Sequence, residues 1–355
     1  MITNHKHYLN LAFKLAESNL GKTKLNPTVG TVIVKNDTVI SFGVTSLNGR
    51  PHAEFNALKK NFFFEGASLY STLEPCTHFG QTPPCVNIIK KKRIKHVYYG
   101  FEDPDKRTHN KAKIILKKNK INVKKIVSKK FKNFYDSYFF NKKFNLPFIS
   151  AKIAISKDYY SINKKSKWIT NESSQKITHL LRSRSDCIFS TSKSINKDNS
   201  LLNCRINGLN NFKPDLFIID LNLKLKKNLS LNKLTNKRNT FLIVIKKNKK
   251  KINFFKKKGF KIILINSLSS KNDFILMFHQ IYKLGYSRAF FETGLTFLNS
   301  LLKYKLVNNL YVLQNNSMLK KNGLNNSSSQ YLKKIKLNKK IKINLNNDNL
   351  YKKTF

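Results

Sequence analysis

Two short segments decide how the first half of this sequence is interpreted. Residues 49–54 read GRPHAE and residues 72–85 read TLEPCTHFGQTPPC, so that His52 is followed by two cysteines, Cys76 and Cys85. A catalytic zinc ion is held by three protein ligands with nitrogen or sulfur donors, and a water takes the fourth position. The spacing therefore predicts a catalytic zinc site formed by His52, Cys76 and Cys85.

Two alternatives compete with a catalytic site, namely a structural zinc site and a chance arrangement of residues. A structural site normally has a fourth Cys or His close by. The other cysteines, Cys187 and Cys204, lie about 100 residues further along the chain, and each is expected to be an ordinary buried residue. His78 is nearby but lies inside the loop between the two cysteines. The catalytic interpretation is therefore favoured.

Glu54 lies two residues after His52 and can move protons without binding the metal. An H-x-E segment followed by P-C is typical of zinc nucleobase deaminases. In that chemistry zinc lowers the pKa of a water, and the carboxylate passes the proton of the water to the departing amine. The residues therefore favour a zinc-dependent deaminase in which Glu54 is the proton shuttle.

A family resemblance becomes visible once further segments are added. The motifs above, together with residues 25–30 (LNPTVG) and 102–104 (EDP), resemble the bifunctional riboflavin-biosynthesis deaminase–reductases. The long loop between Cys76 and Cys85, with its Thr-Pro-Pro, separates this family from the short-spaced cytidine and tRNA adenosine deaminases. The landmarks of the second half are residues 152–154 (KIA), 156–158 (SKD), 168–170 (WIT), 181–182 (LR), 186–188 (DCI), Asp198, Arg205 and 292–296 (ETGLT). The resemblance thus covers most of the chain.

The resemblance implies an α/β chain with two domains. A cytidine-deaminase-like zinc domain would occupy residues 1–146, and a dihydrofolate-reductase-like domain that uses NADPH would occupy residues 147–355. Two consecutive reactions are implied. The first hydrolyses the 2-amino group of a diaminopyrimidinone that carries a ribosylamino 5′-phosphate, and the second reduces the ribosyl group to ribityl with NADPH. The expected cofactors are one zinc ion and NADPH, and the family suggests a cytoplasmic enzyme that forms oligomers through its reductase half.

Carried over by position, the resemblance also implies further site residues. In the deaminase, Asn26 would lie near the base. In the reductase, the residues expected to line NADPH are Ala154, Trp168, Ser194, Asp198, Gly294, Leu295 and Thr296, and those expected to face the substrate are Ser166, Arg182, Leu202, Arg205 and Glu292. A helix that begins after Gly294 offers unpaired N–H groups to a phosphate. Arg182 and Arg205 can each bind the substrate phosphate with two hydrogen bonds.

Several positions depart from the family pattern. In the deaminase half, Thr45 stands where the family has a histidine, and Asn110-Lys111-Ala112 stands where it has Gly-x-Gly. In the loop between the cysteines, Gln81 replaces the basic residue that is expected to meet the substrate phosphate. In the reductase half, Tyr159 replaces the Gly after Asp158, Asp198-Asn199-Ser200 replaces Asp-Asp-Pro, and Leu295 replaces the Pro of the glycine turn. The metal ligands are intact, but the substrate-binding residues of the deaminase are altered and the reductase is altered more broadly. We therefore expect any loss of activity to affect the reductase first.

Apolar periodicity predicts alternating helices and strands in both halves. In the first half, helices are expected at 5–20, 53–60 and 85–92 and strands at 29–34, 39–42, 67–72 and 96–100. In the second half, strands are expected at 148–156, 186–191, 216–220, 241–245, 261–265 and 289–292 and helices at 173–184 and 295–302. The Lys- and Asn-rich stretches 221–239, 246–252 and 320–355 are expected to be loops or solvated edges.

The net charge of +51, from 69 basic and 18 acidic residues, favours a nucleic-acid partner at first sight. The basic residues comprise only 8 Arg and 61 Lys, although Arg is the residue that recognises phosphates and bases with two hydrogen bonds. We therefore attribute the excess mainly to compositional drift on an enzyme surface, and expect no nucleic-acid partner. Two alternatives stay open. One is a zinc nucleoside or tRNA deaminase joined to an unrelated basic domain, and the other is a basic nucleic-acid-binding protein with a structural zinc.

The 355-residue length fits two domains, and 40% hydrophobic residues are enough to build their cores. The sequence has no apolar run of about 18 residues that would predict a transmembrane helix. Residues 1–20 lack the apolar core of a signal peptide, and four cysteines are too few for a disulfide framework.

Overall fold

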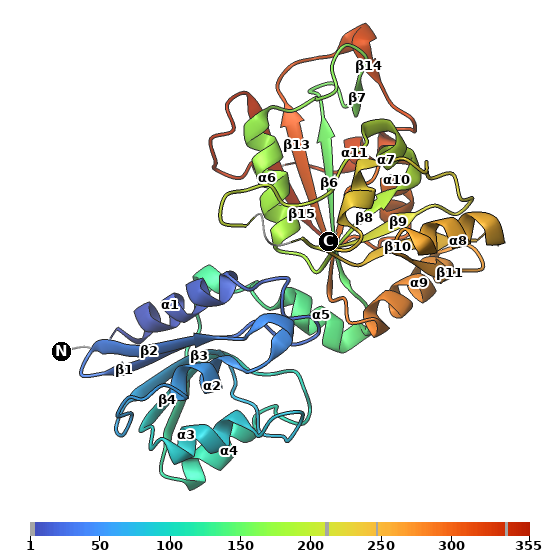
Figure 1. Cartoon of the computed structure of the whole chain (residues 1–355). Coiled ribbons are helices and arrows are strands. Elements are labelled where there is room, and N and C mark those ends of the chain that lie inside the picture. The colour runs from blue at the N-terminus through green and yellow to red at the C-terminus, as the bar shows by residue number, and fades with distance from the viewer. Residues whose placement is uncertain (1–3, 210–212, 246–247, 338–339) are drawn as a thin grey trace. The chain divides into compact units, whose positions relative to one another are not determined.

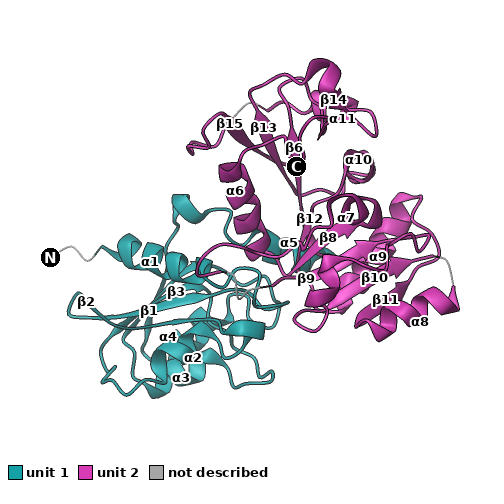
Figure 2. Ribbon diagram, turned by 45° about the horizontal axis from the view of Figure 1, so that its top comes forward, with its two compact units in different colours: residues 1–145 teal, residues 146–355 magenta. Residues whose placement is uncertain are grey.

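The computed structural model describes residues 4–209, 213–245, 248–337 and 340–355. The chain forms two compact units, Met1–Asn145 and Leu146–Phe355, which Figure 2 shows in different colours. Parts of three predictions, at residues 1–3, 246–247 and 338–339, lie outside the described residues.

The first unit is built on one sheet with the strand order β2-β1-β3-β4-β5 (Figure 1). Its elements are α1 (His5–Glu17), β1 (Gly30–Lys35), β2 (Thr38–Val44), α2 (Ala53–Leu58), β3 (Ser68–Leu73), α3 (Cys85–Lys91), β4 (His96–Phe101), α4 (Lys111–Lys118), β5 (Asn122–Lys125) and α5 (Asp136–Phe144). Strand β1 is antiparallel to both neighbours, whereas β3, β4 and β5 run parallel. Parallel strands need crossover connections, and α3 and α4 supply them.

Helices cover both faces of this sheet. Successive residues of a strand point to opposite faces, and in β1 Val32 packs with Ala12 of α1 whereas Ile33 packs with α2, α3 and α4. Helix α5 joins the side of α1, where Tyr138 shares a cluster with Leu9. The unit is therefore a three-layer α/β/α structure.

Gly43 in β2 allows α2 to lie close to the sheet. A Cβ atom at this position would stand 2.3 Å from the carbonyl oxygen of Ala53, which is closer than atoms can pack. Because α2 begins directly after His52, this close approach fixes the height of His52 and Glu54 above the strands.

The second unit contains a larger sheet with the order β11-β10-β9-β8-β12-β6-β13-β15. Its elements are β6 (Phe148–Ile155), β7 (Ile162–Asn163), α6 (Glu172–Ser183), β8 (Cys187–Thr191), α7 (Ser192–Asp198), β9 (Asp215–Ile219), β10 (Thr240–Val244), α8 (Lys249–Lys257), β11 (Phe260–Leu264), α9 (Lys271–Lys283), β12 (Arg288–Phe291), α10 (Leu295–Lys303), β13 (Asn309–Asn315), β14 (Gly323–Leu324), α11 (Gln330–Lys334) and β15 (Asp348–Thr354). Neighbouring strands are parallel except β15, which is antiparallel to β13. Strands β7 and β14 form a separate small sheet.

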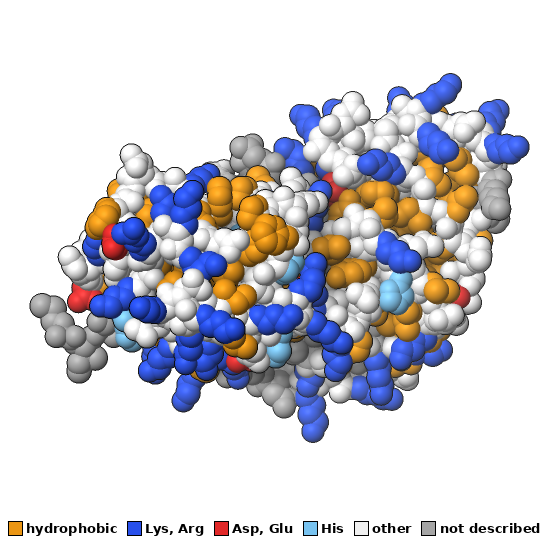
Figure 3. Space-filling model, turned by 90° about the horizontal axis from the view of Figure 1, so that it is seen from below, with side chains coloured by type: hydrophobic (Ala, Val, Ile, Leu, Met, Phe, Trp, Pro, Cys, Tyr) orange, Lys and Arg blue, Asp and Glu red, His pale blue; other side chains and the backbone are white. Residues whose placement is uncertain are grey.

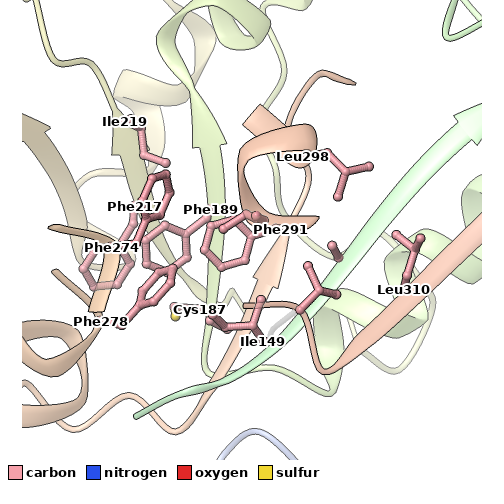
Figure 4. Packing of buried hydrophobic residues seen from close by; sticks show 14 of the residues in the cluster. Ile149, Cys187, Phe189, Phe217, Ile219, Phe274, Phe278, Phe291, Leu298 and Leu310 are labelled. Carbon is pink, nitrogen blue, oxygen red and sulfur yellow. The ribbon is translucent and has the colours of Figure 1, made fainter. Parts of the chain in front are cut away.

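The core of the second unit lies on both faces of its sheet. On one face, α9 and α10 cover an aromatic stack in which Phe189 lies between Phe217 and Phe291, with ring centroids 4.8 and 4.4 Å apart (Figure 4). On the other face, α7 and α8 cover Ile188 and Ile218. Large rings that stack in register bury much apolar area, so this core anchors the strand ends that carry the polar residues described below.

The lysine-rich stretches contain more regular structure than their composition predicts. The expectation of loops or solvated edges is wrong for Lys249–Lys257, which is the helix α8, whereas Asp348–Thr354 is the strand β15 at the edge of the sheet and agrees with the expectation of a solvated edge. Helix α8 buries a single side chain, Phe255, and the strand β15 lies at the edge of the sheet, where exposed lysines are common. Few buried residues leave little periodicity for sequence reasoning to detect.

The basic side chains do not gather into one stripe on the face that Figure 3 shows, where they are interspersed with neutral and hydrophobic residues. Among the described residues, no helix is both long and apolar enough to cross a membrane.

Candidate functional sites

Three side chains of the first unit converge as the sequence predicts. His52 precedes α2, Cys76 follows β3, and Cys85 is the first residue of α3. Nδ1 of His52 lies 3.5 Å from Sγ of Cys76 and 3.4 Å from Sγ of Cys85, and the three donor atoms lie within 4.8 Å of one another. One imidazole and two thiols at this spacing fit a zinc ion with an open fourth position.

The surroundings of Cys76 favour its thiolate. Hydrogen bonds from the side chain of Cys85, from His52 and from the backbone N–H of Cys85 hold the pKa of Cys76 well below its ordinary value. The backbone N–H donates to Sγ of Cys76 over 3.2 Å. The thiolate is the form of cysteine that binds metal. Cys85, itself an expected ligand, therefore stabilises the metal-binding form of Cys76.

Glu54 lies in the first turn of α2 and is only 3% exposed. Its Oε1 accepts a hydrogen bond of 3.1 Å from Ser71 in β3. Burial raises the pKa of Glu54, which makes the carboxyl a better proton acceptor than an exposed glutamate. A carboxyl held beside the ligand cluster, but outside it, can carry protons for a reaction there.

Glu74 has a structural role that its place in the motif does not reveal. Its carboxylate accepts hydrogen bonds from the backbone N–H groups of Asp103, Asn110 and Ala112, at 3.3, 3.1 and 3.1 Å. These bonds tie the strand that leads to Cys76 to the start of α4. The signal in the sequence was an acidic residue in a stretch that is otherwise buried.

Asn26 and Thr45, two further residues of the first unit that the sequence analysis singled out, lie outside its helices and strands. Asn26 packs against Gly49, whose positive φ of 94° brings its backbone so close that a Cβ would stand 2.3 Å from Nδ2 of Asn26. Thr45 is buried, and its Oγ1 accepts a hydrogen bond from the N–H of Val29. Where the family has a histidine, this chain therefore has a hydroxyl that holds β1 to the end of β2.

In the second unit, Arg182 and Glu292 form an ion pair, and both side chains are largely buried. Nε of Arg182 donates to Oε1 of Glu292, and Nη2 donates to Oε2 over 2.9 Å. Nη1 of Arg182 donates to the carbonyl of Asn203 over 2.7 Å. In this arrangement all three nitrogens of the Arg182 guanidinium donate to protein groups, and the residue is 8% exposed.

Lys152 belongs to a landmark segment of the sequence but was not among the expected site residues. It lies in the middle of β6, between Ala151 and Ile153, and burial lowers the pKa of its amine while the charge of Glu292 opposes that shift. Glu292 in turn is held below its ordinary pKa, because Arg182 and Lys152 outweigh the effect of burial. The signal for Lys152 was a single lysine in the apolar strand FISAKIAI.

His179 connects this cluster to Arg205. Nδ1 of His179 lies 3.2 Å from the backbone nitrogen of Arg205 and 3.3 Å from Nη1 of Arg182. Arg205 itself is exposed, and its Nη1 donates to Oδ1 of Asn203 over 2.8 Å. Of the two expected phosphate ligands, only Arg205 therefore presents an accessible guanidinium. Leu202, a further expected substrate residue, is buried with a φ of 47°.

His179→Asn is expected to weaken the loss of stability at acid pH. Burial, Arg182 and Arg205 lower the pKa of His179 from 6.5 to about 4, so below pH 6.5 the unfolded chain takes up a proton that the folded ring refuses. Stability is therefore present above pH 6.5 and falls as the pH decreases toward about 4. Asn keeps an acceptor for the N–H of Arg205 without titrating. Urea unfolding at several pH values checks this, and equal slopes in both proteins would contradict it.

Some of the expected cofactor and substrate residues lie at β6 and at the starts of α7 and α10, whereas others are exposed and lie apart from the Arg182–Glu292 cluster. Ser194 lies in the first turn of α7 beside Gly294, since a Cβ on Gly294 would lie 3.9 Å from Oγ of Ser194, and Ala154 shares the face of β6 with Lys152. The side chain of Leu295 is buried, so only its backbone can face a cofactor, whereas Thr296 is exposed. The described contacts do not join the exposed residues Ser166, Trp168 and Asp198 to the Arg182–Glu292 cluster.

Comparisons with known proteins agree with both halves. The family model "Cytidine and deoxycytidylate deaminase zinc-binding region" matches residues 2–101, and the model "RibD C-terminal domain" matches residues 147–324. The riboflavin biosynthesis protein RibD of Aquifex aeolicus is 31% identical over 302 residues, which is 84% of this chain and 83% of that protein. The RibD of Buchnera aphidicola is 32% identical over 321 residues, covering 86% and 85%.

Solved structures show the same fold over nearly the whole length. Acinetobacter baumannii RibD matches with a TM-score of 0.82 at 23% identity, covering 98% of each chain. A diaminohydroxyphosphoribosylaminopyrimidine deaminase/5-amino-6-(5-phosphoribosylamino)uracil reductase of Thermotoga maritima matches with a TM-score of 0.81 at 22% identity, covering 98% of this chain and 97% of that one.

Proposed function

This chain belongs to the RibD family of bifunctional riboflavin-biosynthesis deaminase–reductases, and from that membership we propose how its two units divide the two reactions. The chain is an enzyme with both activities. We assign the deamination to residues 1–146 and the reduction to residues 147–355. The convergence of His52, Cys76 and Cys85 carries the first assignment, because three donors at this spacing beside a buried glutamate suit hydrolytic deamination.

The proposed deaminase substrate is 2,5-diamino-6-(ribosylamino)pyrimidin-4(3H)-one 5′-phosphate. His52, Cys76 and Cys85 would hold a zinc ion, which when bound supplies a Lewis acid that lowers the pKa of a water. Glu54 would take the proton of that water and deliver it to the departing 2-amino group. Ser71 orients the carboxyl of Glu54 from β3, and Asn26 would contact the base.

The proposed reductase site lies at the ends of β6, β8 and β12. NADPH would supply the hydride that reduces the ribosyl group. Ala154, Ser194, Gly294, Leu295 and Thr296 support a cofactor site at the start of α10, and Trp168 and Asp198 would complete it from exposed segments. Glu292, Leu202 and Ser166 would face the substrate.

The observed ion pair changes the proposed role of Arg182. Arg182 would hold the carboxylate of Glu292 in place, and Arg205, whose guanidinium is exposed, would bind the phosphate. Lys152 would add a buried amine next to Glu292, where it can donate a hydrogen bond or a proton to the sugar.

A product assay tests the proposal. The zinc-loaded protein is incubated with the diaminopyrimidine phosphate, with and without NADPH, and with cytidine as the alternative substrate. Ammonia release from the pyrimidine phosphate without NADPH, followed by NADPH oxidation and a ribityl product, is the expected result. Deamination of cytidine alone, or NADPH oxidation without the deaminated product, would contradict it.

A further inference from the structure

The loop between Cys76 and Cys85 contains no lysine or arginine, and Nδ1 of its one histidine, His78, lies 3.1 Å from Oγ1 of Thr108. At the position where the family resemblance leads us to expect one that meets the substrate phosphate, this chain has Gln81. Gln81 is exposed and neutral, as are its neighbours Gly80 and Pro83. A phosphate that enters this loop would therefore need a positive charge from another segment.

Arg50 brings such a charge to the same loop from the segment before α2. Nη1 of Arg50 donates to Oγ1 of Thr82 over 2.6 Å. Its Nη2 lies 3.2 Å from the place where a Cβ of Gly80 would stand, so the guanidinium rests against the backbone of Gly80. The guanidinium of Arg50 thus contacts Gly80 and Thr82, the two residues that flank Gln81 in the sequence.

The guanidinium of Arg50 is unusual among the arginines of this unit. Arg93 pairs with Glu65 and Arg107 pairs with Asp105, whereas no carboxylate lies within ion-pair distance of Arg50 among the residues that the structure describes. Arg50 is also partly buried and lies two residues before the metal ligand His52. It is therefore a cation without an anion, beside the reaction centre.

We propose that Arg50 binds the 5′-phosphate of the deaminase substrate, in place of the basic residue that the loop has lost. The proposal rests on the proposed function and names a residue that determines its substrate specificity. A guanidinium can offer two parallel N–H groups to a phosphate, and the hydroxyl of Thr82 holds Arg50 in position while adding a further donor.

A purely structural role is the competing explanation, because the Arg50–Thr82 hydrogen bond also holds the loop to the segment before His52. The two roles differ in what they predict. A structural role affects every substrate and zinc retention alike, whereas a phosphate-binding role affects only the phosphorylated substrate.

The first experiment compares Arg50→Ala with the wild type on the diaminopyrimidine substrate and on its dephosphorylated form. We expect KM for the phosphorylated substrate to rise about 10- to 100-fold, the loss of one charge-assisted contact, with zinc content unchanged. The dephosphorylated form should be turned over equally by both proteins. Arg93→Ala, which removes an exposed arginine of the same unit, is the matched control and should leave both substrates unaffected. An equal loss on both substrates, or an unchanged KM, would overturn the proposal.

The second experiment restores the charge from the loop itself. Gln81→Lys in the Arg50→Ala background is expected to recover most of the affinity for the phosphorylated substrate, because it returns a cation to the same place without restoring the Arg50–Thr82 bond. A double variant no better than Arg50→Ala would show that the loop position and Arg50 do not serve one phosphate.

A binding measurement separates this proposal from the proposed function. In the Glu54→Gln background, calorimetric titration with the phosphorylated and dephosphorylated pyrimidines reports affinity without turnover. If the wild type releases no ammonia, the proposed reaction is wrong. Arg50 is then judged on binding alone, where a phosphate preference that Arg50→Ala removes supports it. Equal affinity for both ligands, or for neither, refutes it.

Discussion

Glu54→Gln is expected to lower the rate of ammonia release by about 10²- to 10⁴-fold, which is the usual contribution of a positioned proton carrier. The amide has the shape of the carboxyl and can still accept the hydrogen bond from Ser71, but it cannot take a proton from water and return it to the amine. Because Glu54 is not among the three converging ligands, zinc content should stay at the wild-type level. Coupled ammonia detection and metal analysis of the purified protein measure both quantities.

Glu65→Gln provides a matched control, since Glu65 is an exposed glutamate of the same unit that pairs with Arg93. It should leave ammonia release unchanged. Two results would contradict the role of Glu54. One is activity in Glu54→Gln close to that of the wild type, and the other is a loss of activity that follows a loss of zinc.

The metal site could be predicted from the sequence because its geometry is mostly local. His52 directly precedes α2, Cys85 is the first residue of α3, and Cys76 lies three residues after the end of the buried strand β3. Each ligand therefore sits where an element begins or ends, and the three positions span only a short part of the chain. Spacing alone was enough to bring them together.

The reductase cluster could not be derived in the same way. Arg182 and Glu292 are 110 residues apart, and nothing in either segment predicts that the two side chains form an ion pair with each other. Sequence position suggested two independent substrate contacts. The parallel order of β8, β12 and β6, which depends on the whole sheet, makes them partners instead.

Two residues that replace a family glycine adopt the left-handed backbone conformation that glycine tolerates best. Asn110 and Tyr159 occupy positions where the family has glycine, and both have left-handed backbones, with φ of 59° and 65°. Asn tolerates this conformation well, whereas a bulky residue such as Tyr pays about 1–2 kcal/mol for it. Of the two, Asn110 therefore adopts its turn at little cost, whereas Tyr159 is the more strained, in the unit where we expect activity to be lost first.

Arg182→Leu is expected to have the largest effect on the second unit, lowering its free energy of unfolding by about 3–5 kcal/mol and abolishing NADPH oxidation. Removing one partner of a buried ion pair leaves the other charge without compensation in a site that excludes water. Here Glu292 would lose both hydrogen bonds from the guanidinium, and the carbonyl of Asn203 would lose a donor. Chemical denaturation followed by circular dichroism measures the change.

The double variant Arg182→Leu with Glu292→Leu separates stability from function. Replacing both charges by apolar side chains removes the uncompensated carboxylate, so most of the lost stability should return, whereas NADPH oxidation should not. Lys176→Leu is the control on the same helix, because its pair with Glu172 is exposed and worth at most about 0.5 kcal/mol. Ammonia release should persist in all three variants, since the residues assigned to it lie in the other unit. Return of NADPH oxidation with stability would show that the ion pair supports only the fold.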